Sequence, residues 1–167
     1  MHKKVLTEKA LYYGDVAMPK GFEIDQNKLS DDTLQSVIQN KEFPFSKTWG
    51  MLNTFIIEHI RVEYNLSLIN RKMWGNIYKP EEKTIPLLNV DPVDLRNSPD
   101  FTLLYGVNVK DCMVRIHYDD NRRKGRTWDI ELINNKFIMF PSNNMYHLAN
   151  NQKDSLNFVQ TITYEYI

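Results

Sequence analysis

The sequence contains little cysteine, glycine or histidine and has no excess of charge of either sign. Its single cysteine, Cys112, excludes an intramolecular disulfide and a structural zinc site built on several thiolates. The 21 basic and 21 acidic residues give a formal net charge of zero, so bulk electrostatics give no reason to expect nucleic-acid binding. There are only four histidines, which leaves few ways to build an imidazole metal site. No Gly-rich phosphate-binding loop occurs.

Long apolar runs are missing as well. No run reaches the roughly 18 residues that a membrane helix needs. Residues 1–5 carry charge but no following apolar core, so no secretory signal is expected. We therefore expect a soluble, cytoplasmic protein. A length of 167 residues, 42% of them hydrophobic, predicts a single domain over residues 1–167, with helices in 1–65 and a β-rich core in 66–167.

The first predicted helix follows an irregular N-terminal segment. Residues 30–32, Ser-Asp-Asp, are typical of a helix start with acidic residues in the first turn. Leu34, Val37 and Ile38 predict one short apolar face. The segment 43–45, Phe-Pro-Phe, is expected to end this helix.

A second helix is predicted to begin near Ser46 or Thr48. Apolar residues recur there at three- and four-residue spacing, which is typical of a helix packed on a core. These residues are Trp49, Leu52, Phe55, Ile56, Ile60 and Tyr64.

From about residue 66 the pattern predicts strands separated by Asn-, Gly- and Pro-containing turns. The predicted strands are 66–69, 73–78, 84–88, 101–107, 112–118, 126–132, 136–140, 145–149 and 155–166. Apolar residues at 128, 130 and 132 alternate with polar residues at 127, 129 and 131, which indicates a half-buried sheet. A β-sandwich, barrel or jelly roll fits this spacing. Together with the helices, the fold class is α+β, with two packed antiparallel sheets and the helices on one face.

Two short segments could provide part of a metal site. A facial triad needs two imidazoles and one carboxylate, and residues i and i+2 of a strand face the same side. His117 and Asp119 form a literal H-x-D pair, whereas Asn89 and Asp91 form the same pair with Asn in the first position. His147 could complete either set. The alternative for His117 is a sheet histidine beside a charged hairpin.

Residues 137–142 (Phe-Ile-Met-Phe-Pro-Ser), His147 and residues 153–158 (Lys-Asp-Ser-Leu-Asn-Phe) resemble the C-terminal signature of iron(II)/2-oxoglutarate-dependent oxygenases. The resemblance is to prolyl-hydroxylase-like members, including small proteins carried by marine T4-like phages. Residues 73–78 and 101–107 resemble two upstream strands of that family, so the resemblance covers roughly residues 66–167. It implies a double-stranded β-helix (jelly roll), and location in the host cytoplasm if the chain is phage-encoded.

The family's order of motifs favours Asn89 and Asp91 over His117, because its proximal ligands precede the strand that 101–107 resembles. The resemblance thus implies Asp91 and His147 as iron ligands, with Asn89 in place of a histidine. An amide is a weaker iron(II) ligand than imidazole, so we expect weak iron binding and slow or absent turnover of 2-oxoglutarate. Asn89→His is expected to strengthen iron binding.

The resemblance also implies a set of residues that bind 2-oxoglutarate. Lys153 occupies the position of the family's arginine and lacks its bidentate fork, while Ser155 would add a hydroxyl donor. Trp74, Asn76 and Tyr105 would line the pocket.

Three functional hypotheses follow. The first is a hydroxylase-like oxygenase that uses iron(II), 2-oxoglutarate and dioxygen on a small molecule or a protein substrate. The second is a jelly-roll binding module without a metal, and the third is a structural or interaction protein of a phage. The basic hairpin 122–126 is either a partner site or a solvated turn, and a homodimer is left open.

Overall fold

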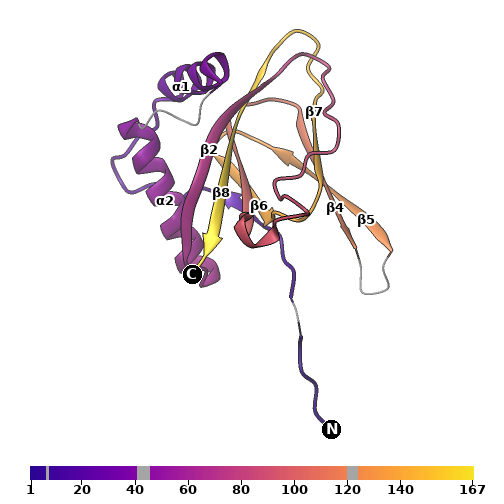
Figure 1. Ribbon diagram of the computed structural model, residues 1–167. Helices are drawn as coiled ribbons and strands as arrows, with labels where there is room; N and C mark the ends of the chain where they lie inside the picture. The colour runs from indigo at the N-terminus through magenta and orange to yellow at the C-terminus, as the bar shows by residue number, and fades with distance from the viewer. Residues whose placement is uncertain (7, 41–45, 120–123) are drawn as a thin grey trace.

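The computed structural model describes residues 1–167 except 7, 41–45 and 120–123. Within the described residues the chain forms eight β-strands and two α-helices (Figure 1). In chain order these are β1 (Tyr12–Asp15), α1 (Gln26–Gln39), α2 (Lys47–Tyr64), β2 (Leu68–Tyr78), the short 3-10 helix η1 (Leu95–Asn97), β3 (Phe101–Asn108), β4 (Cys112–Asp119), β5 (Gly125–Leu132), β6 (Lys136–Pro141), β7 (Tyr146–Asn150) and β8 (Asn157–Tyr166).

The strands form two antiparallel sheets. The larger sheet has the order β1-β6-β3-β8-β2, and the smaller sheet has the order β5-β4-β7. The two sheets lie against each other, and α1 and α2 lie on the side of the larger sheet that faces away from the smaller one (Figure 1). The prediction of an α+β fold with two antiparallel sheets is therefore confirmed.

Two hydrophobic clusters lie between these layers. One joins the helices to the larger sheet and includes Leu52, Ile56 and Tyr164. The other fills the space between the sheets and includes Val114 and Leu148. On β5 the predicted alternation is confirmed, because residues 128, 130 and 132 are buried or half-buried while 127, 129 and 131 are exposed.

Strand boundaries differ from the prediction in two places. The predicted strands 66–69 and 73–78 are one edge strand, β2, whose pairing with β8 is interrupted by a bulge between Asn70 and Lys72. The predicted strand 84–88 is not a regular strand. It runs beside β7 and pairs through two isolated bridges, Lys83 with Ala149 and Leu87 with Tyr146.

The first helix differs from its prediction in its start and in the face that it buries. It begins at Gln26, after an N-cap at Asp25 whose carboxylate accepts a hydrogen bond from the backbone N–H of Lys28. The predicted apolar face at 34, 37 and 38 is exposed. The buried face is mainly polar. On this face the Ser36 hydroxyl accepts a hydrogen bond from the backbone N–H of Gly75 on β2.

A glycine is required where α1 meets β2. A Cβ atom on Gly75 would lie 2.8 Å from the backbone oxygen of Thr33. The second helix matches its prediction better: Ser46 caps it through the backbone N–H of Trp49, and the described part of its buried face matches the predicted spacing. The predicted stop at 43–45 lies outside the described residues.

Candidate functional site

A network of neutral polar side chains lies between the two sheets. The Nδ2 group of Asn89 donates to Thr102 Oγ1 and to Tyr146 Oη, both at 3.2 Å. The hydroxyls of Thr102 and Ser142 are hydrogen-bonded at 2.9 Å. Thr102, Ser142 and Tyr146 are each less than 4% exposed. Burial raises the pKa of Tyr146, and the hydrogen bond from Asn89 acts in the opposite direction. These four residues are called the Asn89 network below.

Backbone pairing brings the members of the Asn89 network together from distant parts of the chain. Leu87 N donates to Tyr146 O at 2.8 Å, and Tyr146 N donates to Leu87 O at 3.1 Å, which holds the segment before Asn89 against β7. Thr102 of β3 pairs with Phe140 of β6, two residues before Ser142. The network thus joins both sheets.

His147 lies on the other face of β7 from this network, because successive residues of a strand face opposite sides of the sheet. Tyr146 packs into the core between the sheets, with its ring centroid 5.0 Å from that of Phe140. His147 is half-buried on the outer face, where its Nδ1 lies 3.2 Å from the carbonyl oxygen of Thr84. The structure therefore does not bring Asn89 and His147 to one side of the strand.

Asp91 lies in an exposed turn. Its Oδ1 accepts a hydrogen bond from the backbone N–H of Val93 at 2.9 Å, and its own N–H donates to Ser98 Oγ at 2.8 Å. The carboxylate thus stabilises the turn that leads into η1.

The described residues between the sheets do not fit an iron ion. Iron(II) sites of the implied kind use imidazole and carboxylate ligands. The Asn89 network offers one amide and three hydroxyls, which are already hydrogen-bonded to one another. In the part of the chain that the structure describes, no group of three or more His, Cys, Asp or Glu residues could hold a metal ion.

The residues that the resemblance implies for 2-oxoglutarate binding lie in separate places. Lys153 and Ser155 are exposed in the connection between β7 and β8, where the carbonyl oxygen of Ser155 accepts a hydrogen bond from Asn150 Nδ2 at 2.9 Å. Trp74 and Asn76 line a cavity along β2.

Tyr105 faces the helices instead. Its hydroxyl donates to Asn135 Oδ1 at 2.9 Å, and its ring meets that of Trp49 edge-on with centroids 6.0 Å apart. Burial raises the pKa of Tyr105. Its side chain thus belongs to the core between the helices and the larger sheet.

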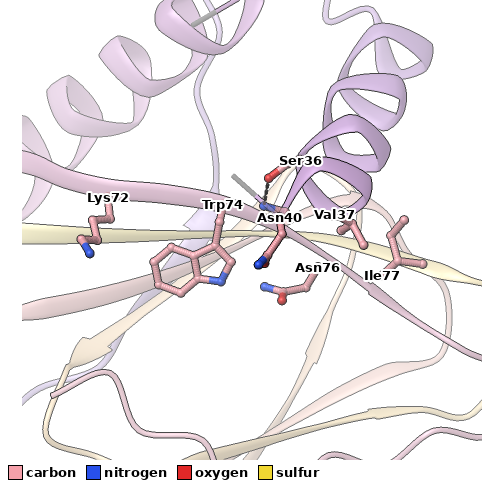
Figure 2. Close-up of a pocket in the computed structure, with 8 residues that line it drawn as sticks. Ser36, Val37, Asn40, Lys72, Trp74, Asn76 and Ile77 are labelled. Carbon is pink, nitrogen blue, oxygen red and sulfur yellow. Dashed lines mark hydrogen bonds between the residues drawn. The ribbon is translucent and has the colours of Figure 1, made fainter. Parts of the chain in front are cut away.

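Two cavities adjoin each other along β2 and share Lys72 and Trp74. One, of about 600 Å³, lies between β2 and the C-terminal part of α1 (Figure 2). The other, of about 220 Å³, extends toward Asn89 and is also lined by Arg71. Figure 2 shows Lys72, Trp74 and Asn76 on the same side of β2, as their two-residue spacing requires. We call this region the Trp74 groove.

The outer face of the smaller sheet carries a second group of polar side chains. The rings of His117 on β4 and His147 on β7 lie with centroids 4.6 Å apart. Arg115 donates to both carboxylate oxygens of Asp129 at 2.8 and 2.9 Å. Burial lowers the pKa of His117, and the neighbouring His147 and Arg115 lower it further. Asp119, the other half of the H-x-D pair, is exposed at the end of β4.

Sequence reasoning named Asn89 but missed the three hydroxyl residues of its network, Thr102, Ser142 and Tyr146. A signal for Tyr146 was present: Tyr146, Leu148 and Asn150 alternate with His147 and Ala149, and the larger apolar side chains mark the inward face. That alternation points His147 outward. No short-range pattern marks Thr102 and Ser142, which meet only through the pairing of β3 with β6.

No protein-family model and no curated protein matches the chain. Solved structures do match its fold. A prolyl-4-hydroxylase from Pseudomonas putida is similar with a TM-score of 0.66 at 11% identity, over 94% of this chain and 88% of that one. The non-heme alpha-ketoglutarate-dependent epimerase SnoN from nogalamycin biosynthesis is similar with a TM-score of 0.64 at 9% identity, over 93% and 77%. A prolyl hydroxylase from Trichoplax adhaerens, solved with a hypoxia-inducible-factor peptide, gives 0.55 at 14% identity, over 93% and 83%.

These likenesses show that the chain has the jelly-roll-like fold of the 2-oxoglutarate oxygenases. At such low identity they establish the fold alone. Among the described residues, no helix has the length and hydropathy to cross a membrane.

Proposed function

We propose that this chain is a binding protein with the oxygenase fold that holds a small carboxylate ligand in the Trp74 groove without iron. The observation that carries the proposal is the Asn89 network. Asn89 donates both of its resolved hydrogen bonds to buried hydroxyls, while His147 faces the outside of the smaller sheet. The fold is thus combined with a neutral, hydrogen-bonded interior where the resemblance implies a metal.

The Trp74 groove has the chemistry to bind a small polar anion. The half-buried indole of Trp74 offers a flat apolar surface, and Lys72 places a cationic side chain beside it. Asn76 is fixed at the floor, because its Nδ2 donates to Thr161 Oγ1 at 2.8 Å, and the same amide nitrogen carries a second N–H that can donate to an anion.

The groove also carries basic side chains. Arg71 lines its smaller cavity and is held by Glu165 at 2.8 Å and by the carbonyl oxygen of Asn97 at 2.9 Å. Lys72 lines both cavities. A carboxylate ligand would interact with these cationic groups, and salt should weaken that interaction because the groups are exposed.

Titration with 2-oxoglutarate in the presence of a chelator tests the proposal. We expect tryptophan fluorescence to respond without metal, and Trp74→Phe to remove the response. Trp128→Phe, a change on β5, is the matched control and should retain it. Lys72→Gln should weaken binding, whereas Lys79→Gln, just beyond β2, should not. No response in the native protein would refute the proposed ligand.

The competing hypothesis is an active iron(II)/2-oxoglutarate oxygenase with Asp91, His147 and Asn89 at the metal, and the fold likeness supports it. An anaerobic iron titration separates the two. We expect the affinity for 2-oxoglutarate to be the same with and without iron, and no visible charge-transfer band. Binding that requires iron, together with that band, would favour the oxygenase.

A further inference from the structure

The outer face of the smaller sheet holds a feature that the Trp74 groove does not use. Two of the chain's four histidines, His117 and His147, meet there from neighbouring strands. In the register of β4 and β7, His147 pairs with Arg115, so His117 is its diagonal neighbour on the same face. We infer that His117 and His147 form a binding site for a divalent transition metal such as zinc.

The spacing of the two rings suits a shared metal ion. Imidazole nitrogens bind zinc at about 2.0–2.1 Å in tetrahedral geometry, which places the centroids of two such rings roughly 5 Å apart. The observed centroids are 4.6 Å apart, and the ring planes are tilted by 54° rather than stacked. The centroid separation is thus compatible with one nitrogen of each ring binding the same ion.

The contacts of His147 prepare it as a ligand. Its Nδ1 lies 3.2 Å from the Thr84 carbonyl oxygen, which can only accept, so Nδ1 carries the proton and Nε2 keeps its lone pair. A backbone carbonyl in this role is a usual outer partner of metal-binding histidines. Thr84 is itself fixed, because its N–H donates to Leu148 O at 2.9 Å and its hydroxyl accepts from Leu148 N at 3.0 Å.

His117 contributes a ring nitrogen without a partner. Its Nε2 is buried and has no hydrogen-bond partner among the described residues. Burying a polar nitrogen in this way costs free energy unless something binds it. A metal ion shared with His147 would use this nitrogen and remove the cost.

The surroundings leave room for an ion with water ligands. A cavity of about 320 Å³ lies over the two histidines and is also lined by Lys83, Thr84, Met113 and Arg115. The charge of Arg115 is offset by its bidentate pair with Asp129, whereas Lys83 adds a cationic side chain that weakens cation binding. Since only two protein ligands come together here, solvent would complete the tetrahedral shell, and we expect micromolar rather than structural affinity.

This site is independent of the proposed function. It lies on the face of the smaller sheet opposite the Asn89 network, and it shares no residue with the Trp74 groove. Failure of one proposal therefore leaves the other standing.

Zinc titration of the chelator-treated protein, followed by calorimetry and by thermal unfolding, tests the inference. We expect one zinc per chain and a rise in Tm. His117→Ala and His147→Ala should each lose more than the roughly 10–100-fold in affinity that removal of an outer-shell partner costs. His59→Ala, a half-buried histidine on α2 packed against Phe137, is the matched control and should bind zinc as the native chain does.

A second measurement keeps the test valid if either variant fails to fold. In the native protein, imidazole ¹⁵N spectra should show zinc shifting Nε2 of His147, whose Nδ1 remains protonated, together with one nitrogen of His117. Unchanged histidine signals at saturating zinc would overturn the inference. So would zinc binding that survives both substitutions, or stabilisation by inorganic phosphate and not by zinc, which would assign the cavity to an anion.

Discussion

Asn89→Ala is the substitution that best separates a structural Asn89 from a metal-binding one. In the structure its Nδ2 is the donor to two hydroxyls, and one of these belongs to Tyr146, which is 3% exposed. Loss of the donor leaves the buried Tyr146 hydroxyl without this partner, which costs about 1–3 kcal/mol. Thr102 retains its hydrogen bond to Ser142, so the loss of the Asn89–Thr102 hydrogen bond adds at most roughly 0.5–1.5 kcal/mol to this cost.

The expected total is a loss of about 1.5–4.5 kcal/mol in the free energy of unfolding. At about 2–4 °C per kcal/mol for a chain of this size, that corresponds to a Tm lower by roughly 3–18 °C. Urea unfolding of metal-free protein gives the free energy, and calorimetry gives the Tm. Asn97→Ala is the matched control, because that amide donates to Asp94 in an exposed turn and its loss should cost below about 1 kcal/mol.

A Tm within about 1 °C of the native value for Asn89→Ala would refute the reasoning, since a loss of about 1 kcal/mol alone should lower the Tm by about 2–4 °C. The amide would then be free to act as a ligand, and the oxygenase hypothesis would gain. A loss in the expected range, unaffected by iron, supports the neutral interior.

The remaining predictions concern backbone packing, the thiol and iron. Gly106→Ala should lower the free energy of unfolding, measured in urea, by at least the roughly 1–3 kcal/mol of an overpacked core, because its Cβ would collide with the backbone carbonyl of Ile133. Gly125→Ala, whose Cβ meets nothing within 4 Å, should leave it unchanged. Burial raises the pKa of Cys112 to about 12, so a thiol reagent at pH 8–9 should modify only unfolded chains. As the pH rises above the ordinary 9.0, the unfolded thiol ionises first and stability falls. Asn89→His alone should not create an iron–oxoglutarate charge-transfer band, because His147 lies on the opposite face of β7; a band would contradict this geometry.

The period of the hydrophobic pattern predicted most of the fold. The recurrence of apolar residues in α2 and the alternation in β5 each reflect burial of one face, which local sequence records directly. The first helix could not be predicted in this way. Its Leu34, Val37 and Ile38 are exposed, while Thr33 and Ser36 face the sheet because Gly75 lets the two backbones approach closely.

The candidate site was harder to predict than the fold, because register decides it. A shift of one residue on a strand moves a side chain to the other face. A motif can place His147 near the start of a strand, but only the pairing of that strand and the inward packing of Tyr146 decide which face of the sheet His147 lies on. The meeting of His117 with His147 depends likewise on how β4 and β7 align.

The central position of β8 in the larger sheet determines when that sheet can form. Among the described strands β8 is the last in chain order, yet it is hydrogen-bonded to β3 on one edge and to β2 on the other. During synthesis, β2 leaves the ribosome long before its partner β8, so the backbone groups of β2 have no strand to pair with until β8 has been made. The pairing of Leu68 with Tyr166 then joins residues from the two ends of the β-rich region. Such non-local pairing is slow, on the order of milliseconds to seconds, and during that time the unpaired edge of β2 is a site at which the chain can aggregate.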